Sequence, residues 1–121
     1  MQFETKMPYF GRLSVNSMKI VRGGRRTHHN WSEVDEWMSM LANRVSHLRG
    51  KLQSPVKVYI FGHFKDERHP DLDNLFKVVM DGLKLGLGID DKFFIPIAEG
   101  YSTGYEEPVL LIKVEADSVE D

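Results

Sequence analysis

The sequence contains no cysteine, which excludes disulfide bonds and thiolate metal sites. No apolar stretch approaches the roughly 20 residues that a helix needs to cross a bilayer, so we expect no membrane segment. The first residues, 1–6, lack the basic start and apolar run of a secretory signal. These absences favour a cytoplasmic protein. At 121 residues the chain fits one domain over residues 1–121, with an acidic tail at 117–121 that we expect to fray.

Charge of neither sign is in large excess, since the formal net charge is −2 at pH 7. Its distribution is more informative. Residues 1–30 carry six lysines and arginines against one acid, whereas four lysines face twelve acids from Asp71 onward. A basic arm beside an acidic pole suits a protein whose arm contacts phosphates while the acids hold a metal ion. The alternative is that Arg22–Arg26 forms only a solvated loop.

Periodicity predicts an α+β fold in the order β-β-α-β-α-β-β, with two main helices packed on a mixed sheet. The strands are expected near residues 3–7, 18–21, 56–64, 93–101 and 108–116. One helix should begin at Asn30 or Ser32 and be closed by Gly50 and Pro55, with an apolar stripe of Trp31, Val34, Met38, Leu41, Val45 and Leu48. The last two strands are expected to form a hairpin through residues 102–105.

The second helix should run from Asp71 or Asp73 to Leu85 and end at Gly86 and Gly88. Its expected apolar stripe consists of Leu72, Leu75, Phe76, Val79, Met80 and Leu83.

Five aspartates lie between Pro70 and Lys92, at positions 71, 73, 81, 90 and 91. If three of them converged without a cation, each pair at about 5 Å would cost roughly 3 kcal/mol at an effective dielectric near 20. A divalent ion turns this repulsion into binding, which points to Mg²⁺ or Mn²⁺ and to phosphate chemistry. Asp71 and Asp73 are two apart, so an extended backbone would aim both carboxylates at one ion. The alternative is that one caps the helix and the other favours its dipole.

The pair Asp90–Asp91 follows the second helix, so the fold must bring Asp91 back to the helix start if it is to share that ion. A strand running antiparallel along the helix could do so. Lys77 lies four residues from both Asp73 and Asp81. It either stabilises charge near the metal or forms an exposed salt bridge. His69 could contact phosphate.

The segments Pro70–Lys77, Asp81–Leu83 and Ile89–Asp91 resemble the RusA family of Holliday-junction resolvases. Residues 14–16 resemble the family's N-terminal Ser/Asn segment, which approaches DNA. The resemblance implies a RusA-like fold and a homodimeric, Mg²⁺-dependent endonuclease, with Mn²⁺ as a possible substitute. It would cut four-way DNA by paired symmetric nicks during recombination and repair. By the same resemblance, three carboxylates hold the metal and a lysine is needed for cleavage. The matching residues are Asp71, Asp73, Asp91 and Lys77.

Contacts to DNA are expected from the basic residues and from the Ser/Asn positions that match the family. These candidates are Ser14, Asn16, Lys19, Arg22, Arg25, Arg26, Lys65, Arg68 and Asn74. Two alternatives stay open: a DNA-binding module without catalysis, and a metal-dependent hydrolase of small phosphates.

Overall fold

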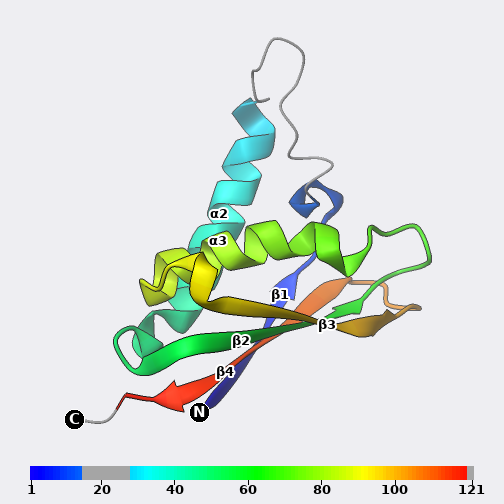
Figure 1. Cartoon of the computed structure of the whole chain (residues 1–121). Helices are drawn as coiled ribbons and strands as arrows, with labels where there is room; N and C mark the ends of the chain where they lie inside the picture. The colour runs from blue at the N-terminus through cyan, green and yellow to red at the C-terminus, as the bar shows by residue number, and fades with distance from the viewer. Residues whose placement is uncertain (15–27, 120–121) are drawn as a thin grey trace.

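The protein is represented by a computed structural model that describes residues 1–14 and 28–119 (Figure 1). Its elements, with η denoting 3-10 helix, are β1 (Gln2–Pro8), η1 (Gly11–Leu13), α2 (His28–Val45), η2 (Ser46–Leu48), β2 (Leu52–His63), η3 (Leu72–Leu75), α3 (Phe76–Leu87), η4 (Asp91–Phe93), β3 (Phe94–Ser102) and β4 (Val109–Ser118). The predicted α+β class with a mixed sheet and two main helices is confirmed. The strand expected near residues 18–21 lies outside the described residues.

The four strands form one sheet in the order β1-β4-β2-β3. Strand β4 pairs antiparallel with both β1 and β2, whereas β3 runs parallel to β2. The predicted hairpin between the last two strands is therefore wrong, because β2 lies between them. Helix α3 carries the chain over the sheet between β2 and β3, and such a crossover places the second strand parallel to the first. Main-chain bonds from Gly104 to Lys65 and from Tyr105 to Phe64 hold the connection to β4 across the end of β2.

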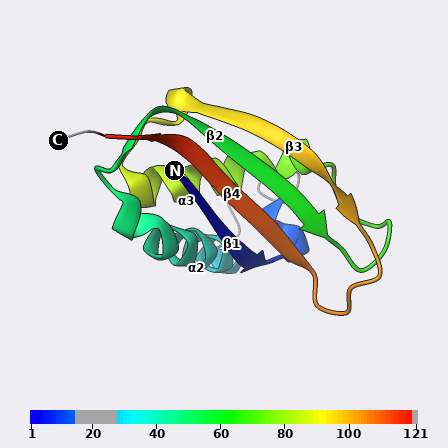
Figure 2. The same cartoon turned by 90° about the horizontal axis from the view of Figure 1, so that it is seen from below.

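Both helices lie on one face of the sheet, and no helix of the described residues covers the other (Figure 2). Alternate residues of β4, including Leu110, Ile112 and Val114, are buried toward the helices, as a strand with one covered face requires. The predicted stripe of the first helix omitted Trp37, which is only 2% exposed. Its indole Nε1 donates a hydrogen bond of 2.7 Å to the Pro8 carbonyl and so ties α2 to β1.

Helix α3 continues through Gly86, which we expected to help end it. A Cβ atom built on Gly86 would lie 2.5 Å from the carbonyl oxygen of Ala42, so this glycine lets α2 and α3 approach closely. The other predicted stop is confirmed. Gly88 adopts φ +72, a left-handed conformation, and its N–H donates to the Lys84 carbonyl at 2.9 Å.

Two strand boundaries differ from expectation. Strand β2 includes Pro55, which we expected to close the preceding helix, and accommodates it where the pairing with β4 is irregular. Strand β4 includes Asp117 and Ser118 of the expected frayed tail. No helix in residues 1–14 and 28–119 has the length and apolar character needed to cross a membrane.

Candidate active site

The acidic junction, which we define as residues 70–74, connects the loop after β2 to η3. Asp71 is extended there, with φ −62 and ψ 148, and its carbonyl accepts a hydrogen bond of 3.0 Å from the Asn74 N–H. Its carboxylate makes no capping bond to η3, so the capping alternative is not supported for Asp71. The side chains of Asp71 and Asp73 are both exposed. Asp73 lies in the first turn of η3, so the extended backbone that would aim both carboxylates to one side ends at Asp71. Both carboxylates face solvent, and Asp73 also has the favourable place near the start of η3 that we considered as the alternative.

Asp71 lies near the C-terminal end of β3. The Tyr101 hydroxyl donates to Glu67 at 3.0 Å, and this bond is the main reason why the pKa of Tyr101 is raised. The negative charge of Asp71 raises the same pKa further, which places Asp71 within electrostatic reach of Tyr101. No local motif in the sequence marks Glu67 or Tyr101, so neither was predicted to belong to this region.

The two residues of the second aspartate pair, Asp90 and Asp91, differ in their contacts. Asp90 caps η4 by accepting the Lys92 N–H at 3.1 Å. That bond, followed by a hydrogen bond with the Asp91 side chain, lowers the pKa of Asp90. Asp91 is the first residue of η4, and its side chain is exposed.

Asp91 precedes the start of β3, whereas the acidic junction follows β2, whose last residue lies beside the end of β3. Figure 1 shows how far β3 extends between its two ends. The strand starts with Phe94 beside Val56 and ends with Ser102 beside His63. His63 is the last residue of β2, and the chain continues from it to Asp71. At about 3.3 Å per residue, the seven steps from Phe94 to Tyr101 cover roughly 23 Å.

Strand β3 runs back along α3 (Figure 1), but Asp91 precedes the strand and so is not carried back to the helix start. Within residues 1–14 and 28–119, no three histidine, aspartate or glutamate side chains are grouped to hold a metal ion. A single chain therefore does not bring the three predicted metal-binding carboxylates together.

Lys77 forms the ion pair that its spacing allows. Its Nζ lies 3.1 Å from a carboxylate oxygen of Asp81, four residues later on α3, and the two side chains are 60% and 29% exposed. The ammonium group thus lies on the surface of α3 in the exposed salt bridge that we considered as the alternative to a catalytic role.

Most predicted DNA contacts in the basic arm lie outside the described residues: Asn16, Lys19, Arg22, Arg25 and Arg26. Ser14 is described and is only 4% exposed. Lys65 and Arg68 are exposed in the loop that leads to the acidic junction. The Arg68 guanidinium lies 2.8 Å from Asp66 and is the main reason why the pKa of Asp66 falls to about 2.

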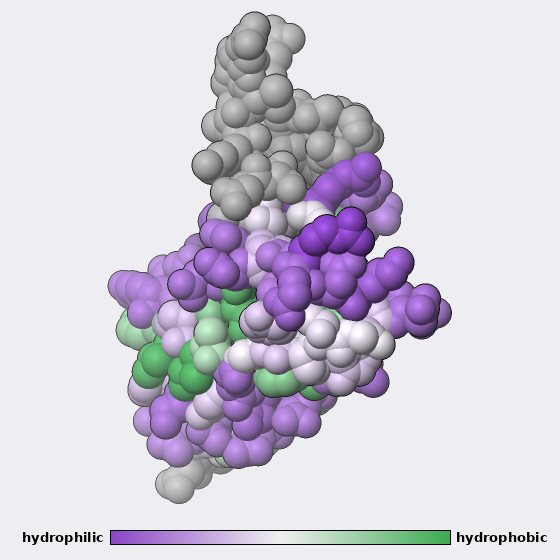
Figure 3. All heavy atoms as spheres, turned by 90° about the vertical axis from the view of Figure 1, so that its right-hand side faces the viewer, coloured by the Kyte–Doolittle hydropathy of each residue, from purple (hydrophilic) through white to green (hydrophobic). Residues whose placement is uncertain are grey.

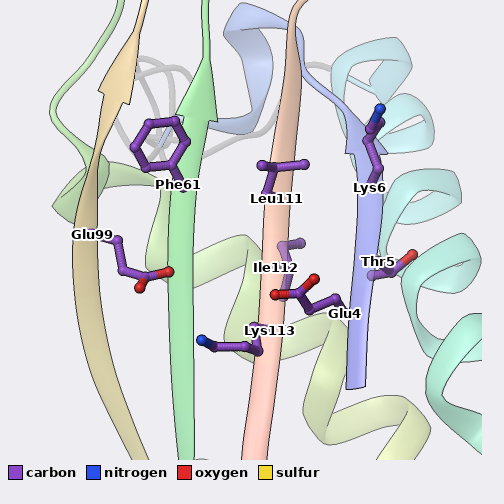
Figure 4. Close-up of a pocket in the computed structure, with 8 residues that line it drawn as sticks. All are labelled: Glu4, Thr5, Lys6, Phe61, Glu99, Leu111, Ile112 and Lys113. Atoms are coloured by element: carbon purple, nitrogen blue, oxygen red, sulfur yellow. The ribbon is translucent and has the colours of Figure 1, made fainter. Parts of the chain in front are cut away.

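The face of the sheet away from the helices carries a separate shallow hollow of about 590 Å³ (Figure 4). Its walls include Phe61, Glu99 and Lys113, and none of the predicted metal-binding carboxylates lines it. On the side of the molecule where β3 lies, a cluster of hydrophobic side chains is surrounded by a largely hydrophilic surface (Figure 3). The hollow is distinct from the acidic junction.

Residues 16–115 match the family model described as endodeoxyribonuclease RusA, which covers most of the chain. The chain belongs to the RusA family. RusA-family proteins are endodeoxyribonucleases that resolve Holliday junctions, and this chain is an enzyme of that class. The family acts on branched DNA, and its nucleases depend on metal ions in general. No match was found among curated proteins.

Proposed function

We propose that this RusA-family protein is a Mg²⁺-dependent homodimer that resolves four-way DNA junctions by paired symmetric nicks, with Mn²⁺ able to substitute. The observation that carries the proposal is the acidic junction. Asp71 and Asp73 are exposed on a backbone held by hydrogen bonds, and the Asp71 carboxylate is not consumed by helix capping. Two exposed carboxylates, one just before η3 and one in its first turn, offer a hard cation the ligands that it prefers.

The metal site requires a second copy of the chain. We place Asp71 and Asp73 of one protomer beside Asp91 of the partner subunit. A twofold axis crossing the middle of β3 exchanges the two ends of that strand, so each acidic junction meets the opposite end of its partner. A metal ion bound there would lower the pKa of its water and offset charge on the scissile phosphate. The dimer would then hold two equivalent sites, one for each of the two opposed strands.

The edge strand β3 offers the surface for this dimer. Exposed apolar side chains lie on or beside it, with Phe93 43%, Ile95 40% and Tyr101 46% exposed. Pro96 lacks an N–H and so interrupts any continuous ladder along the free edge. We therefore expect two copies to meet there through packed side chains rather than by extending the sheet.

Lys77 is the proposed electrostatic assistant. Its ammonium group is paired with Asp81 at the surface, and an exposed pair of this kind is worth only about 0.3–0.5 kcal/mol. A phosphate of bound DNA can therefore replace Asp81 at small cost. The positive charge then stabilises charge that develops on the phosphate during cleavage.

A nicking assay tests the nuclease. Four-way, flap and linear duplex DNA are compared with and without Mg²⁺, and we expect cleavage of the four-way junction only when the ion is present. Asp73→Asn should abolish cleavage while junction binding persists, because the metal loses a ligand and the fold does not. Asp35→Asn, an exposed change on α2, is the matched control and should cleave normally. If Asp73→Asn still cleaves, Asp73 is not a metal ligand. If the unmodified protein does not cleave, the alternative of a DNA-binding module without catalysis is favoured.

Mixing two inactive variants tests the shared site. Asp73→Asn and Asp91→Asn are each expected to be inactive alone. A mixed dimer would hold one site with both changes and one with neither, so random mixing restores about a quarter of all sites. We expect the mixture to nick one strand of a junction without the paired second cut. If each site lay within one chain, every site would keep one change and the mixture would stay inactive.

A further inference from the structure

We propose that His69 is a positioning residue, which fixes the peptide leading into Asp71 and thereby the direction in which the Asp71 side chain leaves the backbone. The inference rests on the proposed nuclease function, in which the Asp71 carboxylate binds metal. His69 itself does not touch the metal or the DNA in this proposal. It acts through the main chain of the acidic junction.

The His69 ring is held between the ends of two parallel strands. Its side chain is 8% exposed. The ring stacks on Phe64, which follows β2, with centroids 4.2 Å apart and planes 14° apart. The edge of the same ring meets Tyr101, near the end of β3, at 4.3 Å and 65°. Because neighbours on both strands fix the ring, its nitrogen atoms have a defined direction.

One of those nitrogen atoms bonds to the main chain of the acidic junction. His69 Nδ1 lies 2.9 Å from the Pro70 carbonyl oxygen. A carbonyl only accepts, so Nδ1 carries the proton and donates it. The Pro70 carbonyl belongs to the peptide unit that enters Asp71. The next peptide unit is held by the Asn74 N–H, which donates to the Asp71 carbonyl at 3.0 Å. Both peptide units that flank Asp71 are thus hydrogen-bonded, and this fixes the direction of its Cα–Cβ bond.

The other ring nitrogen shows why packing alone does not explain a histidine here. Nε2 is buried and has no hydrogen-bond partner within the described part of the chain. It lies 3.8 Å from Glu67, too far for a hydrogen bond. An unpaired buried nitrogen is unfavourable. A phenylalanine would stack on Phe64 and Tyr101 without that cost, so the bond from Nδ1 is the feature that only histidine supplies.

Two substitutions separate positioning from packing. His69→Phe keeps the stacked ring but loses the donor to Pro70. His69→Asn loses the ring but places its amide nitrogen where Nδ1 stood. We expect His69→Phe to melt at or above the temperature of the unmodified protein and to bind junctions equally well, yet to cleave them about 10–100-fold more slowly, which is the usual effect of losing a group that orients metal ligands. His69→Asn should melt at a lower temperature and cleave faster than His69→Phe.

A purely structural His69 gives the opposite order, with activity following melting temperature. Cleavage by His69→Phe at the unmodified rate overturns the proposal, whether or not His69→Asn folds. Hydrogen exchange at the Asn74 amide gives a readout that does not depend on cleavage. We expect faster exchange in His69→Phe, since freeing the Pro70 peptide loosens the next bond, and unchanged exchange would also overturn the proposal. If the unmodified protein does not cleave, the nuclease proposal fails, while the exchange measurement still decides the positioning role.

Discussion

Asp66 and Arg68, two charged side chains of the loop before the acidic junction, pair with each other. Asp66 accepts hydrogen bonds from both the side chain and the backbone N–H of Arg68, which lower its pKa from 3.8 to about 2. A depressed carboxyl pKa stabilises the folded state above the unfolded pKa, and this contribution is lost as pH falls from about 4 through about 2. At neutral pH the pair is therefore fully charged, and DNA must compete with Asp66 for Arg68.

Replacing Arg68 tests this local pairing. Arg68→Ala should return the pKa of Asp66 toward its ordinary value, because both the guanidinium and its charge are removed. Carbon NMR titration of the Asp66 carboxyl measures the change. Lys65→Ala is the control, since Lys65 contributes the smallest part of the shift and should leave most of it in place. An unchanged Asp66 titration in Arg68→Ala would contradict the pairing.

Replacing Lys77 separates its two roles. Lys77→Ala should lower the free energy of unfolding by only about 0.3–0.5 kcal/mol, because its ion pair with Asp81 is exposed. Cleavage of a four-way junction should nevertheless slow strongly while binding is retained, which single-turnover assays and gel shifts measure separately. Lys51→Ala, another exposed lysine, serves as the control for loss of one positive charge. A normal cleavage rate in Lys77→Ala would show that Lys77 has no catalytic role and only forms the salt bridge with Asp81.

At the scale of elements, the contact between α2 and α3 depends on a residue without a side chain. Gly86→Ala should destabilise the fold by about 1–3 kcal/mol, because the new methyl group meets the Ala42 backbone and must push the helices apart. Thermal or urea unfolding measures the change. Gly11→Ala is the control, since a Cβ there meets no atom of residues 1–14 or 28–119 within 4 Å. Equal stability of the two variants would show that the helices can separate freely.

Elements were predictable where their signal is local. The strands near residues 3–7 and 56–64 alternate clearly, and the structure has β1 and β2 there. The stripe of the second helix is also largely confirmed, with Leu75, Val79 and Leu83 fully buried. The hairpin failed for a physical reason: turn residues between two strands favour a reversal of the chain, but they carry no information about a third strand that lies between them. The prediction that Gly86 helps to end the second helix was wrong for a similar reason, because the contact with Ala42 that requires this glycine joins residues distant in sequence.

At the scale of the whole molecule, we expect function to depend on the dimer. Ile95→Asp should place a charge on the exposed edge of β3, weaken association and thereby reduce cleavage, while the monomer stays folded. Sedimentation measures the dimer and circular dichroism the fold. Leu85→Asp replaces another exposed apolar side chain, on α3, and is the matched control. If Ile95→Asp forms dimers as stable as those of the unmodified protein, the dimer interface does not lie at the edge of β3.

The sequence by itself determined the family and the enzyme class of this protein. The acidic motif from Asp71 to Lys77 and the pair Asp90–Asp91 predicted the RusA family, and the family match confirmed it. Such motifs are readable because they need only residue types at short spacings. Periodicity within single helices and strands is readable for the same reason.

Only the tertiary structure decided which segments meet. It placed β2 between β3 and β4, brought His69 against Phe64 and Tyr101, and left Asp91 at the far end of β3 from Asp71. These relations depend on how strands pair and helices pack across long stretches of chain, where no spacing rule in the sequence applies. The distance along β3 is the reason why the proposed metal site needs two copies of the chain.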